Sequence, residues 1–236
     1  MTAGRNDILD GIRRSLGRKG PIDDKRADEL RARMATPARN LLPARAELPP
    51  AAVIDLFQSM AEGVFATVVR VADMGAVPDA LADYLKRENL PAQVVMAPDV
   101  TLDRAPWARQ PLLEIRRGVP QESDMVSVTS APAAVAETGT LAMFSGPDHP
   151  STLNFLPETH VVVLPADRVA KNYEDVWDVL RDRAAGSENS PESSMPRTVN
   201  FITGPSRSGD IEQTLLLGAH GPRRLHIILV DPDDTA

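Results

Sequence analysis

Residues 199–231 read VNFIT, GPSRSG, DIEQTLLLG, AHGPRR and LHIILVD in order, and the fold of the whole chain is inferred outward from this stretch. The first and last segments are short apolar runs rich in β-branched residues, which is typical of buried strands. Between them, Ile211, Leu215 and Leu216 fall at roughly helical spacing, and Gly218 can end a helix. The stretch therefore predicts a strand–loop–helix–strand unit within a parallel sheet.

The loop at 204–209 is the first candidate binding site, because ligands of open α/β sheets bind at the carboxyl ends of the strands. It offers backbone amides, two hydroxyls and an arginine at the start of the expected helix, which are groups that an anion requires. It lacks the lysine of a Walker loop and the glycine spacing of a dinucleotide fingerprint. A loop that merely caps a helix explains the spacing equally well. The candidate ligand contacts here are Gly204, Ser206, Arg207, Ser208 and Gly209.

His220 lies in the turn at the foot of the expected helix and is also a candidate ligand contact. A cation at a helix terminus explains this histidine more simply than catalysis does, because no partner for it is visible in the sequence.

The second candidate site is the stretch AETGT at 136–140, where Glu137 stands alone among small residues just before a predicted strand. Such a carboxylate either accepts hydrogen bonds from loop amides or acts as a base or nucleophile. Glu137 is therefore the candidate catalytic residue. Thr138, Gly139 and Thr140 are candidate ligand contacts, and Gly139 permits unusual backbone dihedrals.

The composition excludes several functional classes. The 236 residues include no cysteine, so this chain cannot hold an iron–sulfur cluster through thiolates or use thiolate catalysis. The four histidines show no metal-binding spacing, so no metal site is expected. A net charge of −7 argues against general nucleic-acid binding. Without a long apolar run or a signal peptide, we expect a cytoplasmic protein with no membrane span.

The chain is expected to have two parts. Residues 1–50 predict a helical arm, with short helices at 5–17 and 22–34, followed by a proline-spaced linker. Residues 51–236 predict one α/β domain, because strands with continuous apolar runs alternate with helices, as in a covered parallel sheet. A helix is expected at 167–183 and a polar surface loop at 186–194.

Four motifs together resemble the LUD domain family. They are AETGT at 136–140, LPETHVVVL at 156–164, GPSRSGDIE at 204–212 and GAHGPRRLH at 218–226. The resemblance covers about residues 50–232 and implies a fold like the ribose-5-phosphate isomerase and CoA-transferase group. It also implies a part in oxidation of L-lactate to pyruvate, beside two partner proteins that carry the iron–sulfur clusters. Many relatives have an arginine within 145–154 that this chain lacks.

Three functions remain open from the sequence. The first is a non-redox subunit that binds a small anion, such as lactate, or a phosphate-bearing cofactor, and assembles with iron–sulfur lactate utilization proteins. The second is a stand-alone CoA-transferase- or isomerase-like enzyme that uses Glu137, which rests on fold analogy. The third is a regulatory or scaffold protein. The residues identify no cofactor. Convergence of Glu137 and Arg207 on one cleft would favour the enzyme.

Overall fold

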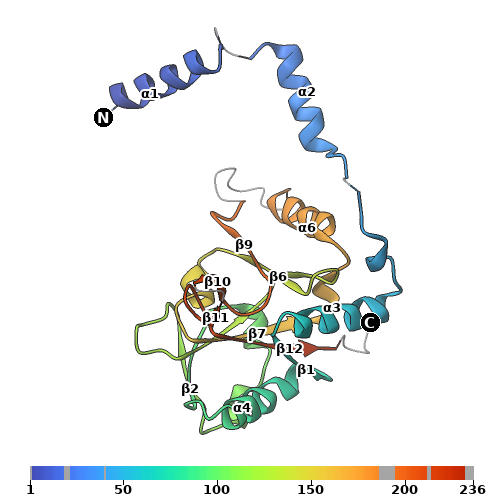
Figure 1. Cartoon of the computed structure of the whole chain (residues 1–236), viewed down its shortest axis with the longest axis vertical. Helices are drawn as coiled ribbons and strands as arrows, with labels where there is room; N and C mark the ends of the chain where they lie inside the picture. The colour runs from blue at the N-terminus through green and yellow to red at the C-terminus, as the bar shows by residue number, and fades with distance from the viewer. Residues whose placement is uncertain (1, 19–21, 40, 186–194, 212–213, 232–236) are drawn as a thin grey trace. The chain divides into compact units, whose positions relative to one another are not determined.

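A computed structural model describes residues 2–18, 22–39, 41–185, 195–211 and 214–231, and Figure 1 shows the chain. The chain separates into two compact units, residues 1–41 and residues 42–236. The first unit contains α1 (Thr2–Ser15) and α2 (Asp24–Ala35), which confirms the two N-terminal helices. The side chain of Asp23 caps the N-terminus of α2, where it accepts a hydrogen bond from the amide of Arg26 at 2.8 Å. The arm boundary at residue 50 remains a prediction.

The second unit is organised on a six-stranded sheet in which every neighbouring pair of strands is parallel. This confirms the expected open, mainly parallel sheet. Two of its central strands are buried along their whole length, because elements cover both faces. Residues 161–164 are accordingly a continuous apolar run, whereas residues 126–130 read VSVTS and their buried hydroxyls are hydrogen-bonded. The strand order is β1 (Thr67–Val71), β12 (Arg224–Val230), β7 (Thr159–Pro165), β4 (Val126–Ser130), β2 (Gln93–Met96) and β3 (Glu114–Arg117).

A second, four-stranded sheet follows from the carboxyl end of β4. Its order is β8 (Val169–Ala170), β5 (Ala133–Val135), β6 (Thr140–Phe144) and β9 (Val199–Ile202). The β5–β6 and β6–β9 pairs are antiparallel, whereas β5 and β8 run parallel. The prediction that the strands at 199 and 225 belong to one parallel sheet was therefore wrong, since β9 pairs with β6 and β12 lies in the larger sheet.

The helices of this unit cover the two sheets in layers (Figure 1). Helix α4 (Val77–Arg87) packs on one face of the large sheet through Leu81 and Leu85. Helix α3 (Pro50–Gly63) and the small sheet cover the opposite face, where Phe57 of α3 is fully buried. Helix α6 (Tyr173–Ala185) packs on the far face of the small sheet. The short helices are α5 (Val100–Asp103), η1 (Ala44–Ala46), η2 (Met74–Ala76), η3 (Trp107–Arg109), η4 (Ser151–Asn154) and η5 (Ala166–Arg168).

Helix α6 begins later than the sequence predicted. The residues before Tyr173 form η5 and strand β8 instead of helix, and Asn172 marks the new start by accepting a hydrogen bond from the amide of Asp175 at 3.1 Å. The polar tract expected at 186–194 lies outside the described residues.

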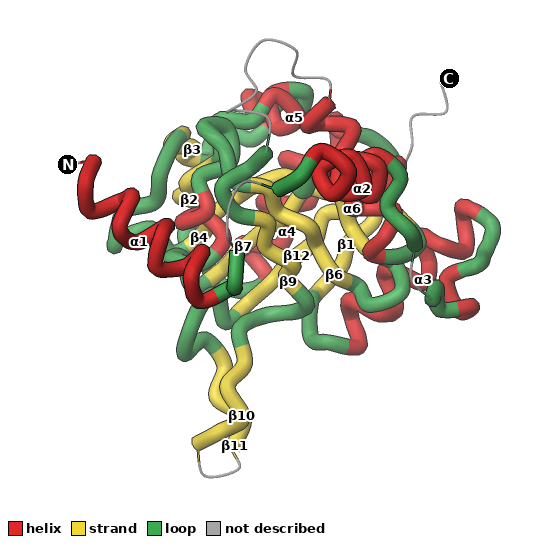
Figure 2. The backbone as a smooth tube through the Cα atoms, turned by 90° about the horizontal axis from the view of Figure 1, so that it is seen from above, coloured by secondary structure: helices red, strands yellow, loops and turns green. Residues whose placement is uncertain are grey.

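The helix expected after the 204–209 loop is also wrong. The chain instead forms the antiparallel strands β10 (Arg207–Ile211) and β11 (Thr214–Leu217), which project from the rest of the unit (Figure 2). The segment is too short for a stable helix, and TLLL at 214–217 is a continuous run without helical period. Gly204 and Gly218 have φ values of 74° and 85°, so left-handed residues stand on either side of the two strands.

Candidate functional site

Four of the residues predicted from the 204–209 loop and the following turn meet at one cavity. Gly204, Ser206, Arg207 and His220 all line a space of about 260 Å³ at the foot of the β10–β11 hairpin. Ser208 and Gly209 lie further along β10. Because no helix starts here, the macrodipole and free amides expected of a helix N-terminus do not contribute to anion binding.

Backbone hydrogen bonds at the base of the β10–β11 hairpin hold these residues in place. The amide of Ser206 donates to the carbonyl of Pro222 at 2.8 Å, and the amide of Gly218 donates to the carbonyl of Ser206 at 2.9 Å. The Ser206 hydroxyl accepts from the amide of His220 at 3.2 Å. A Cβ at Gly204 would lie 2.2 Å from the carbonyl oxygen of Val64, so this position requires glycine. The loop is therefore fixed against the end of α3.

Arg207 is exposed, and its guanidinium carbon lies 5.0 Å from the centre of the Phe65 ring. The ring stabilises the cation without neutralising it. No carboxylate among the described side chains pairs with Arg207. The guanidinium therefore keeps donors for an oxyanion at the mouth of this cavity.

The floor of the same cavity contains a buried histidine. His160 is 1% exposed, and its Nε2 lies 2.8 Å from the Thr129 hydroxyl. Its Nδ1 is buried without a hydrogen-bond partner. Burial lowers the pKa of His160 to about 3, so the ring is neutral at physiological pH. Apolar groups form much of the remaining wall, among them Phe155, Phe201, Ile202 and Leu225.

The AETGT turn packs behind this loop against α3. Gly139 has φ 64°, and a Cβ there would lie 2.2 Å from the backbone nitrogen of Ala61. The hydroxyls of Thr138 and Thr140 are 2.7 Å apart, and Thr140 also lies 2.7 Å from the hydroxyl of Thr203. The turn is therefore joined to the residue that precedes Gly204.

Glu137 is buried in this turn. It is 5% exposed, its amide donates to the carbonyl of Lys171 at 3.2 Å, and its Oε2 has no hydrogen-bond partner. Glu137 is not among the residues that line the cavity of Arg207. Thr140 of the AETGT turn thus contacts Thr203, which directly precedes the 204–209 loop. Arg207 lines the cavity, whereas Glu137 does not.

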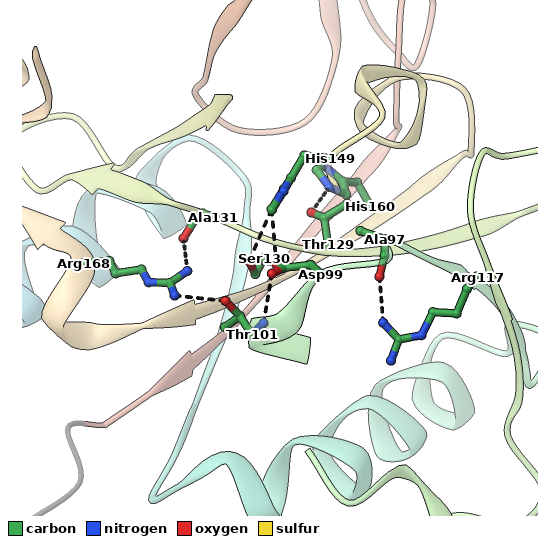
Figure 3. A network of polar contacts seen from close by, with 10 residues as sticks. All are labelled: Ala97, Asp99, Thr101, Arg117, Thr129, Ser130, Ala131, His149, His160 and Arg168. Atoms are coloured by element: carbon green, nitrogen blue, oxygen red, sulfur yellow. Dashed lines mark hydrogen bonds and ion pairs between the residues drawn. The ribbon is translucent and has the colours of Figure 1, made fainter. Parts of the chain in front are cut away.

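The structure also contains a polar centre that the sequence did not predict, in addition to the Arg207 cavity and the Glu137 turn. Asp99 follows β2, Ser130 ends β4, and His149 comes from the loop after β6 (Figure 3). The Nε2 of His149 lies 3.2 Å from Oδ2 of Asp99 and 3.5 Å from the hydroxyl of Ser130. Ser130 also donates a hydrogen bond to Asp99. The centre lies at the carboxyl ends of parallel strands, where such sheets bind ligands.

Hydrogen bonds keep Asp99 ionised despite its burial. Asp99 is 3% exposed, and burial acts to raise its pKa. Hydrogen bonds from His149, Ser130 and the amide of Thr101 outweigh that effect and hold the pKa well below its usual range. Because the Ser130 hydroxyl donates to Asp99 and not to His149, this is no serine-nucleophile triad. It is a carboxylate that orients an imidazole.

Arginine contacts hold the backbone around this centre (Figure 3). Arg168 donates to the carbonyl of Ala131 at 3.1 Å and to the hydroxyl of Thr101 at 3.0 Å. Arg117 donates to the carbonyl of Ala97 at 2.7 Å. The carboxyl ends of β2 and β4 are thereby fixed on both sides of Asp99.

The described residues show neither a cluster of metal ligands nor a membrane-spanning helix. Within the described ranges, no three His, Asp or Glu side chains gather as metal ligands would. The helices of the described residues include none with the length and apolar character needed to cross a bilayer.

Comparisons with known proteins identify the family to which the chain belongs. Residues 54–230 match the model of the LUD domain. The chain belongs to the LUD domain family. A crystal structure of a DUF162 family protein from Deinococcus radiodurans shares the fold of this LUD domain, with a TM-score of 0.57 and 20% identity over 78% of this chain and 99% of that one.

Sequence relatives of this LUD domain match it over part of their length. An uncharacterized protein from Neisseria meningitidis is 36% identical over 44% of this chain and 42% of its own. Lactate utilization protein C from Bacillus subtilis is 33% identical over 46% of this chain and 43% of its own. Lactate utilization protein C from Anoxybacillus flavithermus is 32% identical over 45% and 44%. The matches span less than half the length of these relatives.

Proposed function

We propose that this LUD domain protein takes part in the oxidation of L-lactate to pyruvate as a subunit without redox centres of its own. The observation that carries the proposal is its 32–33% identity to two proteins named lactate utilization protein C. The chain has no cysteine, so the electrons would pass through iron–sulfur partner proteins rather than through thiolate-bound clusters here.

In this proposal the cavity at the hairpin foot binds a small carboxylate, with lactate as the candidate. Its volume of about 260 Å³ suits a small ligand better than a whole nucleotide cofactor. Arg207 supplies a forked cation for the carboxylate, and Ser206 and His220 supply further polar groups beside it. The neutral ring of His160 lies at the floor. A phosphate-bearing cofactor is the other candidate ligand.

A stand-alone group-transfer enzyme is the second candidate function. It is favoured by one observation, the buried Oε2 of Glu137 without a hydrogen-bond partner. The absence of Glu137 from the walls of the Arg207 cavity weighs against it, because a nucleophile must reach the bound substrate.

The test is growth on L-lactate of a deletion strain that has no other lactate route but retains the partner genes. Loss of growth, restored by the wild-type gene, is the expected result. A tagged copy purified from lactate-grown cells should bring down iron-containing partner proteins, measured as iron and labile sulfide. Normal growth of the deletion strain on lactate would contradict the proposal.

A further inference from the structure

A second and larger cavity lies beside the Asp99–His149 centre. Its volume is about 710 Å³, and its walls come from the loop after β6, the last turn of α6 and the segment before β9. The polar side chains that line it are Ser145, His149, Ser151, Arg183, Arg197 and Thr198.

The described residues that line this cavity carry charge of one sign. Two arginines and a histidine line the cavity, and no Asp or Glu stands among its described lining residues, although the chain as a whole carries a net charge of −7. The guanidinium carbon of Arg183 lies 5.9 Å from the centre of the Phe144 ring, and none of the described carboxylates forms an ion pair with Arg183 or Arg197. Two guanidinium groups that pair with no described carboxylate thus line this cavity, and such groups attract an anion with several oxygens.

Hydrogen bonds hold the two sides of the cavity together. The amide of Thr198 donates to the hydroxyl of Ser145 at 2.9 Å, and the amide of Ser145 donates to the carbonyl of Thr198 at 3.0 Å. The hydroxyls of Ser151 and Thr198 lie 3.3 Å apart. Gly146 and His149 exchange backbone hydrogen bonds of 3.2 and 3.1 Å across a tight turn. The segments that carry Arg197 and His149 are therefore fixed relative to each other.

His149 also lines this cavity, and its ring is held in one orientation. Its Nε2 faces Asp99 and Ser130, which leaves Nδ1 as the ring nitrogen for the cavity (Figure 3). The side chain of His149 is 16% exposed, whereas that of Asp99 is 5% exposed. The carboxylate thus orients the imidazole from the side away from the cavity, as carboxylates that accept hydrogen bonds from metal-binding histidines do at other sites.

We propose that this cavity binds a phosphate-bearing small molecule, with Arg183 and Arg197 on its phosphate oxygens and His149 as a third contact. Paired arginines with forked donors match the geometry of phosphate oxygens, and the larger volume admits more than a lone carboxylate. Asp99 is a positioning residue that acts through His149. The proposal does not depend on the lactate site, which has its own cavity and a single arginine.

The test is calorimetric titration of the full-length protein with inorganic pyrophosphate. The wild type should bind, and Arg183→Ala or Arg197→Ala should each weaken binding by about 10- to 150-fold, as expected for one charge-assisted contact. Arg181→Ala is the matched control, because Arg181 lies on the same helix but pairs with Asp178 at 2.7 Å. No binding by the wild type, or an equal loss in Arg181→Ala, would overturn the proposal.

The role of Asp99 is tested by a double-mutant cycle. Asp99→Asn should weaken pyrophosphate binding in the wild-type background and have no further effect in the His149→Asn background, because its effect passes through the imidazole. Ser130→Ala provides a milder change at the same centre if Asp99→Asn does not fold. Equal losses of affinity in both backgrounds would show that Asp99 does not act through His149 and would overturn this part of the proposal.

Discussion

Two buried histidines predict that acid destabilises the fold. His160 and His226 are each 1% exposed. Burial lowers the pKa of His160 to about 3, and burial together with Arg87 lowers the pKa of His226 to about 4. His226 lies 2.8 Å from the hydroxyl of Thr67 through Nδ1 and stacks on Tyr84 with ring centres 3.8 Å apart. Both rings are therefore neutral in the folded protein.

The unfolded chain takes up protons on these histidines as the pH falls through about 6.5, whereas the folded protein does not until far lower pH. The unfolded state then binds more protons, so the free energy of unfolding falls as the pH falls. At pH 5 each histidine is about 1.5 pH units below its unfolded pKa, and at about 1.4 kcal/mol per unit each contributes about 2 kcal/mol of destabilisation. The sum of about 4 kcal/mol is a large share of the 5–15 kcal/mol typical of a domain.

Urea unfolding at pH 7 and pH 5, followed by circular dichroism, measures this difference. Asp99 does not interfere, because its lowered pKa places its loss of stability below about pH 4, where unfolded aspartates protonate. His226→Gln should lower the stability at both pH values but reduce the pH dependence by about half. Equal unfolding free energies of the wild type at the two pH values would refute the assignment of both rings as buried and neutral.

Three further predictions concern the turn, its glutamate and the arm. Gly139→Ala should lower the free energy of unfolding by at least about 1–2 kcal/mol because of its left-handed φ alone, and by more because of the clash with Ala61. Gly146→Ala is the control, because a Cβ there meets open space, and it should melt like the wild type. Equal melting of the two variants would contradict the docking of the turn on α3. Glu137→Gln should melt no lower than the wild type but fail to restore growth of the deletion strain on lactate; restored growth would show that the carboxylate only accepts hydrogen bonds. Removal of residues 1–41 should leave a cooperative melt, because the buried Ala46 and the half-buried Leu48, which packs against the core, remain. An insoluble product would place the arm in a folded interface.

The large sheet could be predicted because its strands carry a strong local pattern. Val161 to Leu164 and Ile227 to Val230 are uninterrupted apolar runs, and both segments are buried on both faces. Leu81 and Leu85 mark α4 by helical spacing, and both are buried against the sheet.

The hairpin and the small sheet could not be predicted in the same way. Ile211, Leu215 and Leu216 satisfy helical spacing by coincidence, because so short a segment cannot distinguish the two periods. Strands β5 and β8 have three and two residues, and alanines make up much of them, so they show little pattern at all.

The candidate sites also differ in how far their residues could be predicted from the sequence. Gly204, Ser206, Arg207 and His220 are close together in the sequence, so their convergence could be anticipated from a turn. Asp99 and His149 are brought together only by the strand order, which places the carboxyl ends of β2 and β4 beside the loop after β6. The sequence around Asp99 gives no sign that His149 is its partner, and the sequence around His149 gives no sign of Asp99.

Titration of the full-length protein with L-lactate is the direct test that the Arg207 cavity binds a small carboxylate. The wild type should bind, and Arg207→Ala should bind about 10- to 150-fold more weakly through loss of one charge-assisted contact. Arg223→Ala is the neighbouring control, since Arg223 faces Glu158 at 3.9 Å and does not line the cavity. Its affinity should match the wild type. Absence of lactate binding by the wild type, or equal affinity in Arg207→Ala, would contradict the claim.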